Sequence, residues 1–147
     1  MTENATVPGT PLDAIERSLD LDHPIERVWR AISDPTELVR WFPNESATLD
    51  VRPGGTGEFV WIIEGKEFRA EVHVHEVQPP TRFVWSWGHE PSNTDEPVTT
   101  VEFELAERDE GGTTLVVRES GFLADKHRDG NHEGWGEELG ELVEYLG

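Results

Sequence analysis

The run NHEGWGEELGELVEYL, residues 131–146, decides the fold. Its large apolar residues recur at spacings of three and four, so they form one stripe along a helix. The stripe consists of Trp135, Leu139, Leu142, Val143 and Leu146. Five glutamates, Glu133, Glu137, Glu138, Glu141 and Glu144, lie mostly on the other sides. The pattern predicts a closing amphipathic helix from about residue 131 to residue 146, with its apolar face buried against the rest of the protein.

Upstream of this run, short segments of alternating apolar and polar residues are separated by turn signals, which is typical of strands joined by hairpins. The strands are predicted at residues 58–63, 67–77, 83–87, 98–105 and 113–119, with a polar loop over 88–96. Tight turns between consecutive strands favour an antiparallel meander. The closing helix offers the only long apolar surface that could cover one face of this sheet.

The N-terminal part predicts one strand and two short helices. Residues 1–12 are polar and read as a flexible leader, which leaves 13–147 as a single domain. Ile15, Leu19 and Leu21 indicate a first strand. Pro24 and Pro35 each suit the first turn of a helix, and the second helix has to end before Pro43. The expected fold class is α+β.

Composition excludes several classes of function. The chain has 31 acidic and 12 basic residues and a net charge of −19, which disfavours nucleic acids and anionic membranes as partners. It has no cysteine, so disulfides, thiolate metal sites and cysteine nucleophiles are excluded. It shows no signal segment and no run of membrane-spanning length. These features predict a soluble, cytoplasmic protein without a cofactor.

Several segments, taken in order, resemble a known superfamily. They are PIERVWRAI (24–32), Asp34-Pro35, Trp41-Phe42, Pro53-Gly54-Gly55, VQPPTRFVWSW (77–87), ESGF (119–122), and Gly134-Trp135 leading into the leucines of the closing helix. This series resembles the START-like (SRPBCC, birch-allergen-like) superfamily. More narrowly, it resembles bacterial proteins similar to the C-terminal domain of the activator of the heat-shock protein 90 ATPase.

The resemblance implies a helix-grip fold, in which a curved antiparallel sheet wraps around the long C-terminal helix and leaves a cavity between them. Two short helices follow the first strand in this fold. Relatives include lipid and hormone carriers, aromatic polyketide cyclases, antibiotic-sequestering proteins and co-chaperone domains. They share no catalytic motif, so the resemblance assigns no catalytic residue to this chain. It favours a protein that binds a hydrophobic or aromatic small molecule.

The residues expected to line the cavity are mostly aromatic. They are Trp41, Phe42, Trp61, Phe68, Phe83, Trp85, Trp87, Phe103, Glu119, Phe122, Trp135 and Leu139. Such rings are also the usual content of a solid core, so the cavity expectation depends on the resemblance. Glu119 is the one ionisable member. It could anchor a ligand hydroxyl inside the cavity, or it could lie at the rim and pair with Arg118 or another arginine.

Histidines and glycines give weaker signals. His73 and His75 share one face of a strand but lack a third ligand at any recognised spacing, so no metal site is predicted. The run from Gly54 to Gly57 precedes a strand rather than a helix and is interpreted as a turn. Two other functions stay open: a cyclase or dehydratase using Glu119 or His132, and an interaction module of the co-chaperone type. A protein partner or a homodimer stays open as well.

Overall fold

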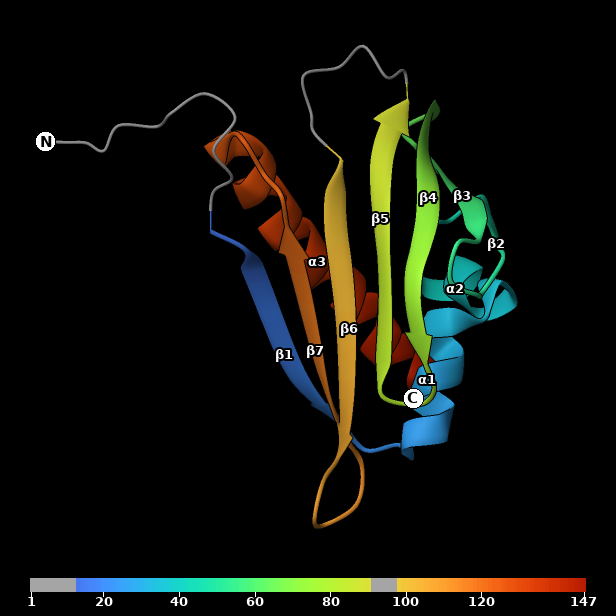
Figure 1. Cartoon of the computed structure of the whole chain (residues 1–147), viewed down its shortest axis with the longest axis vertical. Helices are drawn as coiled ribbons and strands as arrows, with labels where there is room; N and C mark the ends of the chain where they lie inside the picture. Colours follow the sequence, from blue (N-terminus) through green and yellow to red (C-terminus); the bar gives the residue numbers. More distant parts are fainter. Residues whose placement is uncertain (1–12, 91–97) are drawn as a thin grey trace, which may run out of the picture.

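The computed structural model describes residues 13–90 and 98–147, and the expected leader lies outside this range. In chain order the elements are β1 (Ile15–Leu21), α1 (Ile25–Ser33), α2 (Pro35–Trp41), β2 (Ser46–Leu49), β3 (Thr56–Ile63), β4 (Lys66–Gln78), β5 (Arg82–Glu90), β6 (Thr99–Glu107), β7 (Thr113–Ser120) and α3 (Asp125–Leu146). The strands form one curved antiparallel sheet, and α3 lies against one of its faces (Figure 1). The α+β helix-grip fold is therefore confirmed.

The sheet is a meander with one addition. Its order is β1-β7-β6-β5-β4-β3-β2, so strands β2 to β7 follow one another and β1 returns to the far edge beside β7. The tight turns lie where glycines permit them. Between β3 and β4, Glu64 and Gly65 both have positive φ angles (52° and 78°), as a two-residue hairpin turn requires.

The closing helix packs through the predicted stripe, with two differences. Trp135, Leu139 and Leu142 are buried, whereas Val143 is 47% exposed and does not belong to the packed face. The helix begins at Asp125 rather than near residue 131. Its first turns carry no apolar stripe, and for this reason sequence periodicity does not reveal them.

Arg17 connects the edge strand β1 to α3. Its guanidinium donates to the main-chain oxygen of His132 from Nη2 (2.9 Å) and Nε (3.2 Å). Gly136 allows this approach, because a Cβ there would lie 2.8 Å from Arg17 Nη2. The arginine that breaks the apolar alternation of β1 is therefore a contact between strand and helix.

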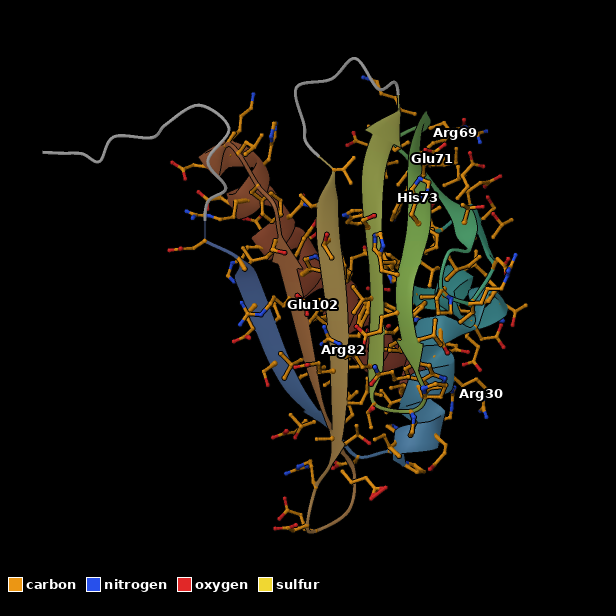
Figure 2. All side chains as sticks on the ribbon, in the orientation of Figure 1. Arg30, Arg69, Glu71, His73, Arg82 and Glu102 are labelled. Atoms are coloured by element: carbon orange, nitrogen blue, oxygen red, sulfur yellow. The ribbon has the colours of Figure 1, made fainter. Side chains whose placement is uncertain are left out.

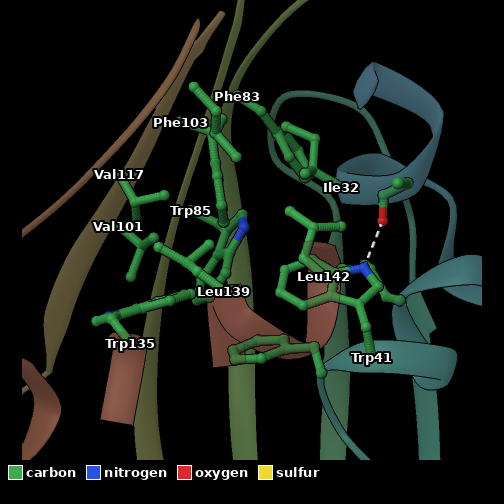
Figure 3. Close-up of a cluster of buried hydrophobic side chains, with 14 of the residues drawn as sticks. Ile32, Trp41, Phe83, Trp85, Val101, Phe103, Val117, Trp135, Leu139 and Leu142 are labelled. Carbon is green, nitrogen blue, oxygen red and sulfur yellow. Dashed lines mark hydrogen bonds between the residues drawn. The ribbon is translucent and has the colours of Figure 1, made fainter. Parts of the chain in front are cut away.

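The middle of the interior is a solid aromatic core. Phe59, Phe83, Trp85 and Phe103 are all at most 1% exposed, and Leu142 of α3 packs into the same cluster (Figure 3). Strand β5 contributes to it over a longer span than expected and continues to Glu90, so the loop predicted from residue 88 does not begin there. The rest of that predicted loop, 91–97, lies outside the described residues.

Candidate functional site

Packing is incomplete where α2, β3 and α3 meet. Two adjoining hollows lie there, with volumes of about 350 Å³ and 320 Å³. Both are lined by Phe42, Trp61, Ile63, Glu137 and Glu138. The first, the α2 hollow, is also lined by Val39, Arg40, Trp41, Asn44 and Glu141. The second, the sheet hollow, is also lined by Phe68, Trp87, Asn131, Gly134 and Trp135. Each volume is sufficient for a small organic ligand.

Phe42 holds the aromatic walls together. It follows the last residue of α2, and Pro43 prevents the helix from continuing. Its ring stacks on Trp135 with centroids 5.2 Å apart and on Trp87 at 5.7 Å, and it meets Trp61 edge to face at 5.3 Å. One residue of a helix terminus therefore joins rings from β3, β5 and α3 into a single wall.

The mouth of the sheet hollow is apolar. Ile63 and Phe68 stand at the turn between β3 and β4 and are 48% and 46% exposed. The neighbouring backbone is held in place by Asn44, whose Nδ2 donates to the oxygen of Ile62 while its Oδ1 accepts from the nitrogen of Ile62. Exposed apolar side chains at the rim of a hollow are typical of a binding site.

Glu138 is the unusual ionisable group of the hollows. Its Oε2 is buried and has no hydrogen-bond partner. Burial raises the pKa of its carboxyl to about 8, and the charges of Glu141 and Glu137 add to the rise. Sequence reasoning missed this residue because it is one of many glutamates in the closing helix. The one indication in the sequence is that Glu138 precedes Leu139 and therefore lies at the border of the apolar stripe.

Glu119 is fully buried at the other end of the same region. It accepts hydrogen bonds from the indole Nε1 of Trp87 and of Trp135, each at 2.8 Å, from the hydroxyl of Thr99, and from Nδ2 of Asn131 at 3.2 Å. Trp87, Asn131 and Trp135 stand between it and the sheet hollow, whose walls they form. We call Glu119 and these four donors the Glu119 cluster.

The arginine-paired alternative for Glu119 is wrong. Arg118 points to the other face of β7 and binds Glu16 at 3.1 Å. Because each of its four partners donates to it, the carboxyl of Glu119 fixes the orientation of two indole rings and of the helix that carries Trp135. Its role in the described structure is to position the wall of the hollow.

The remaining predicted cavity residues divide into two groups. Trp41 lines the α2 hollow, and its Nε1 donates to the main-chain oxygen of Ala31 at 2.9 Å, the bond dashed in Figure 3. Five others are buried in the core and line neither hollow: Phe83, Trp85, Phe103, Phe122 and Leu139.

The outer face of the sheet is polar and largely paired with itself. Arg82 binds Glu76, Glu102 and Glu104 across three strands. Figure 2 labels Arg82 and Glu102 on neighbouring strands of this face. His73 lies 3.4 Å from Glu71, and His75 is hydrogen-bonded to Ser86 at 2.8 Å. Within residues 13–90 and 98–147, no group of three or more His, Asp or Glu is arranged to hold a metal ion. Over the same ranges no helix is long and apolar enough to cross a membrane.

Comparisons with known proteins agree with this architecture. The model of a family described as "Activator of Hsp90 ATPase homolog 1-like protein" matches residues 22–147. No curated protein matches the chain.

Solved structures do match. CalU16 from Micromonospora echinospora is 26% identical, with 97% of this chain and 81% of that chain covered and a TM-score of 0.75. A protein from Rhizobium leguminosarum is 24% identical, with coverages of 93% and 96% and a TM-score of 0.79. DynU16, from the dynemicin biosynthetic locus, is 22% identical, with coverages of 91% and 47% and a TM-score of 0.77.

Proposed function

The chain belongs to the family of activator of Hsp90 ATPase homolog 1-like proteins, and from this premise we propose that it binds a hydrophobic small molecule in the α2 and sheet hollows. The observation that carries the proposal is an aromatic-walled space left open between α3 and the sheet, beside a core of buried aromatic and aliphatic side chains. Cytoplasmic location stays a prediction from composition, and so does any protein partner.

The chemistry of the walls supports an apolar or aromatic ligand. Rings of Phe42, Trp61, Trp87 and Trp135 supply flat surfaces, and a ligand that covers them removes that surface from water. Ile63 and Phe68 at the mouth would become buried on binding. Asn131 in the sheet hollow and Asn44 in the α2 hollow supply a few polar groups that can orient the ligand.

A pair of glycine substitutions tests the proposal with a matched control. A Cβ at Gly134 or at Gly140 meets no other atom within 4 Å, so α3 accepts a side chain at either position. Gly134 lines the sheet hollow, whereas Gly140 lines neither hollow. Titration with the neutral dye Nile red should give saturable fluorescence for the native protein and for Gly140→Leu, and at least a tenfold weaker response for Gly134→Leu.

Two results would count against the proposal. Dye binding that is equal in the two leucine variants would place the bound dye outside the sheet hollow. No saturable binding by the native protein would remove the hollow as a binding site for apolar molecules. Circular dichroism of both variants checks that α3 is retained.

A second function is favoured by Glu138. A carboxyl whose pKa is about 8 carries a proton at neutral pH and can give it to a substrate bound beside it. This would suit a cyclase or dehydratase that uses a polar group of the cavity. In this second function the general acid would be Glu138. Glu119 is less suited because its carboxyl already accepts hydrogen bonds from four donors, and His132 is less suited because it is exposed.

A further inference from the structure

The ionisable groups that line the hollows are mainly acidic. Glu137 and Glu138 line both hollows, and Glu141 lines the α2 hollow. Among the described residues that line the two hollows the only cation is Arg40, which lines the α2 hollow and is exposed. A ligand that carried a negative charge would therefore be placed among three carboxyls, within a protein whose net charge is −19.

One oxygen of the Glu138 carboxyl has no hydrogen-bond donor beside it among the described residues. Its Oε2 is shielded from solvent and accepts no hydrogen bond. Leaving a buried acceptor unpaired costs free energy. A hydrogen-bond donor brought by the ligand would remove this cost, and a positively charged donor would remove it most completely.

The aromatic rings around Glu138 favour the same type of group. Trp61 and Phe42 line both hollows together with Glu138. The faces of aromatic rings carry partial negative charge and attract ammonium groups within about 6 Å. Aromatic walls combined with carboxyls are thus complementary to a cation that has an apolar body.

We propose that the ligand of the hollows is an organic amine, whose ammonium group binds the Glu138 carboxylate beside Trp61 and whose apolar body lies against the wall formed by Phe42. This proposal rests on the proposed function and specifies its ligand class. Neutral aromatic compounds bind the same walls more weakly, and the corresponding carboxylates bind most weakly.

The proposal predicts that a proton is released on binding. At pH 7 the Glu138 carboxyl is mostly protonated, and an ammonium group beside it favours the ionised form. The other ionisable groups that line the hollows are Glu137 and Glu141 of α3 and Arg40 of α2, while the strands contribute Trp, Ile and Phe side chains, which do not titrate. The amine should therefore bind more tightly as the pH rises from 6 to 8.5.

Isothermal titration calorimetry with three molecules of one shape tests this inference: 4-phenylbenzylamine, 4-phenylbenzyl alcohol and 4-phenylbenzoate. At pH 7 the Kd of the amine should be at least tenfold lower than that of the alcohol. Titrations in two buffers of different ionisation enthalpy should show release of a proton on binding of the amine. Glu138→Gln should raise the Kd of the amine about tenfold, abolish the proton release, and leave the Kd of the alcohol within twofold.

Glu133→Gln is the matched control, because it makes the same substitution at an exposed position of α3 outside both hollows. It should leave the preference for the amine intact. Equal affinity for amine and alcohol would overturn the amine proposal while the hydrophobic site stands. An equal effect of Glu133→Gln and Glu138→Gln would overturn it too, by assigning the preference to net charge. If none of the three compounds binds, the proposed function fails and this inference fails with it.

Discussion

Two carboxyls at opposite ends of one aromatic wall, those of Glu119 and Glu138, differ in their hydrogen bonding. Glu119 is fully buried and accepts hydrogen bonds from two indoles, a hydroxyl and an amide. Glu138 is only partly buried, but one of its oxygens is shielded from solvent and has no hydrogen-bond partner. A buried acceptor that is fully paired stabilises the fold, whereas an unpaired one destabilises it unless something else binds there. The contrast separates the structural end of the cavity from the end that we assign to a ligand.

The largest expected effect on stability is that of replacing Glu119, the carboxyl that is fully paired. Glu119→Ala removes the acceptor that the indoles of Trp87 and Trp135 share. The buried N–H of Trp135 loses its acceptor, whereas that of Trp87 keeps its bond to the hydroxyl of Thr99. The free energy of unfolding should fall by about 3–5 kcal/mol, as for other broken buried networks. Urea unfolding followed by far-UV circular dichroism measures it. A loss below about 1 kcal/mol would mean that the Glu119 cluster does not hold α3 to the sheet.

A smaller effect is expected where α3 ends. Glu37 of α2 accepts from Arg27 (2.6 Å), Arg30 (2.6 Å) and the hydroxyl of Tyr145 (2.9 Å), so it ties three helices together. Burial raises the pKa of Glu37, but the hydrogen bonds from Arg27, Tyr145 and Arg30 outweigh burial and hold that pKa below its ordinary value of 4.5.

Because the pKa of Glu37 is lower in the folded protein, Glu37 stabilises the fold more as the pH rises. Its contribution to stability is present above pH 4.5 and is lost as the pH falls through its lower, folded-state pKa. Glu37→Gln should therefore cost about 1–2 kcal/mol at pH 7 and less at pH 3, as measured by urea unfolding at both pH values. An equal cost at the two pH values would show that charge does not contribute to this contact.

An effect of similar size, but with the opposite dependence on pH, is expected for Glu138 at the unpaired end. The pKa of Glu138 is about 8 in the folded protein against an ordinary value of 4.5, so its contribution to stability is complete below pH 4.5 and is lost as the pH rises toward and through 8. Because the side chain keeps some contact with solvent, we expect a loss of only about 1–2 kcal/mol. Glu138→Gln should be neutral at pH 5 and stabilising at pH 9 in thermal unfolding. Destabilisation at both pH values would contradict the unpaired state of this carboxyl.

Most of the fold could be predicted from the sequence because periodic patterns report on local structure. Six of the seven strands, the meander and the packed residues Trp135, Leu139 and Leu142 are confirmed, whereas the short edge strand β2 (Ser46–Leu49) was not predicted. Periodicity failed at the ends of elements. Residues 125–130 are polar, so the first turns of α3 went unseen, and Val143 satisfies helical spacing yet faces solvent.

The candidate site was less predictable, because its contacts join distant parts of the chain. The partners of Glu119 come from β5, β6 and α3, and no spacing in the sequence indicates that they meet. Glu138 differs from the exposed glutamates of α3 because of the way the helix packs on the sheet, which the sequence alone does not show. The aromatic residues were identified as a set, but the division between solid core and hollow wall depends on the position of Phe42 at the end of α2.

The most direct test compares indole signals in ¹⁵N-labelled protein during titration with 4-phenylbenzylamine. Trp61 lines both hollows, whereas Trp29 packs on Phe83 and lines neither. We predict a saturable shift of the Trp61 indole resonance with that of Trp29 unmoved. If the Trp61 resonance stays in place at saturating amine, or if Trp29 shifts as much, the space between α3 and the sheet is not where the ligand binds.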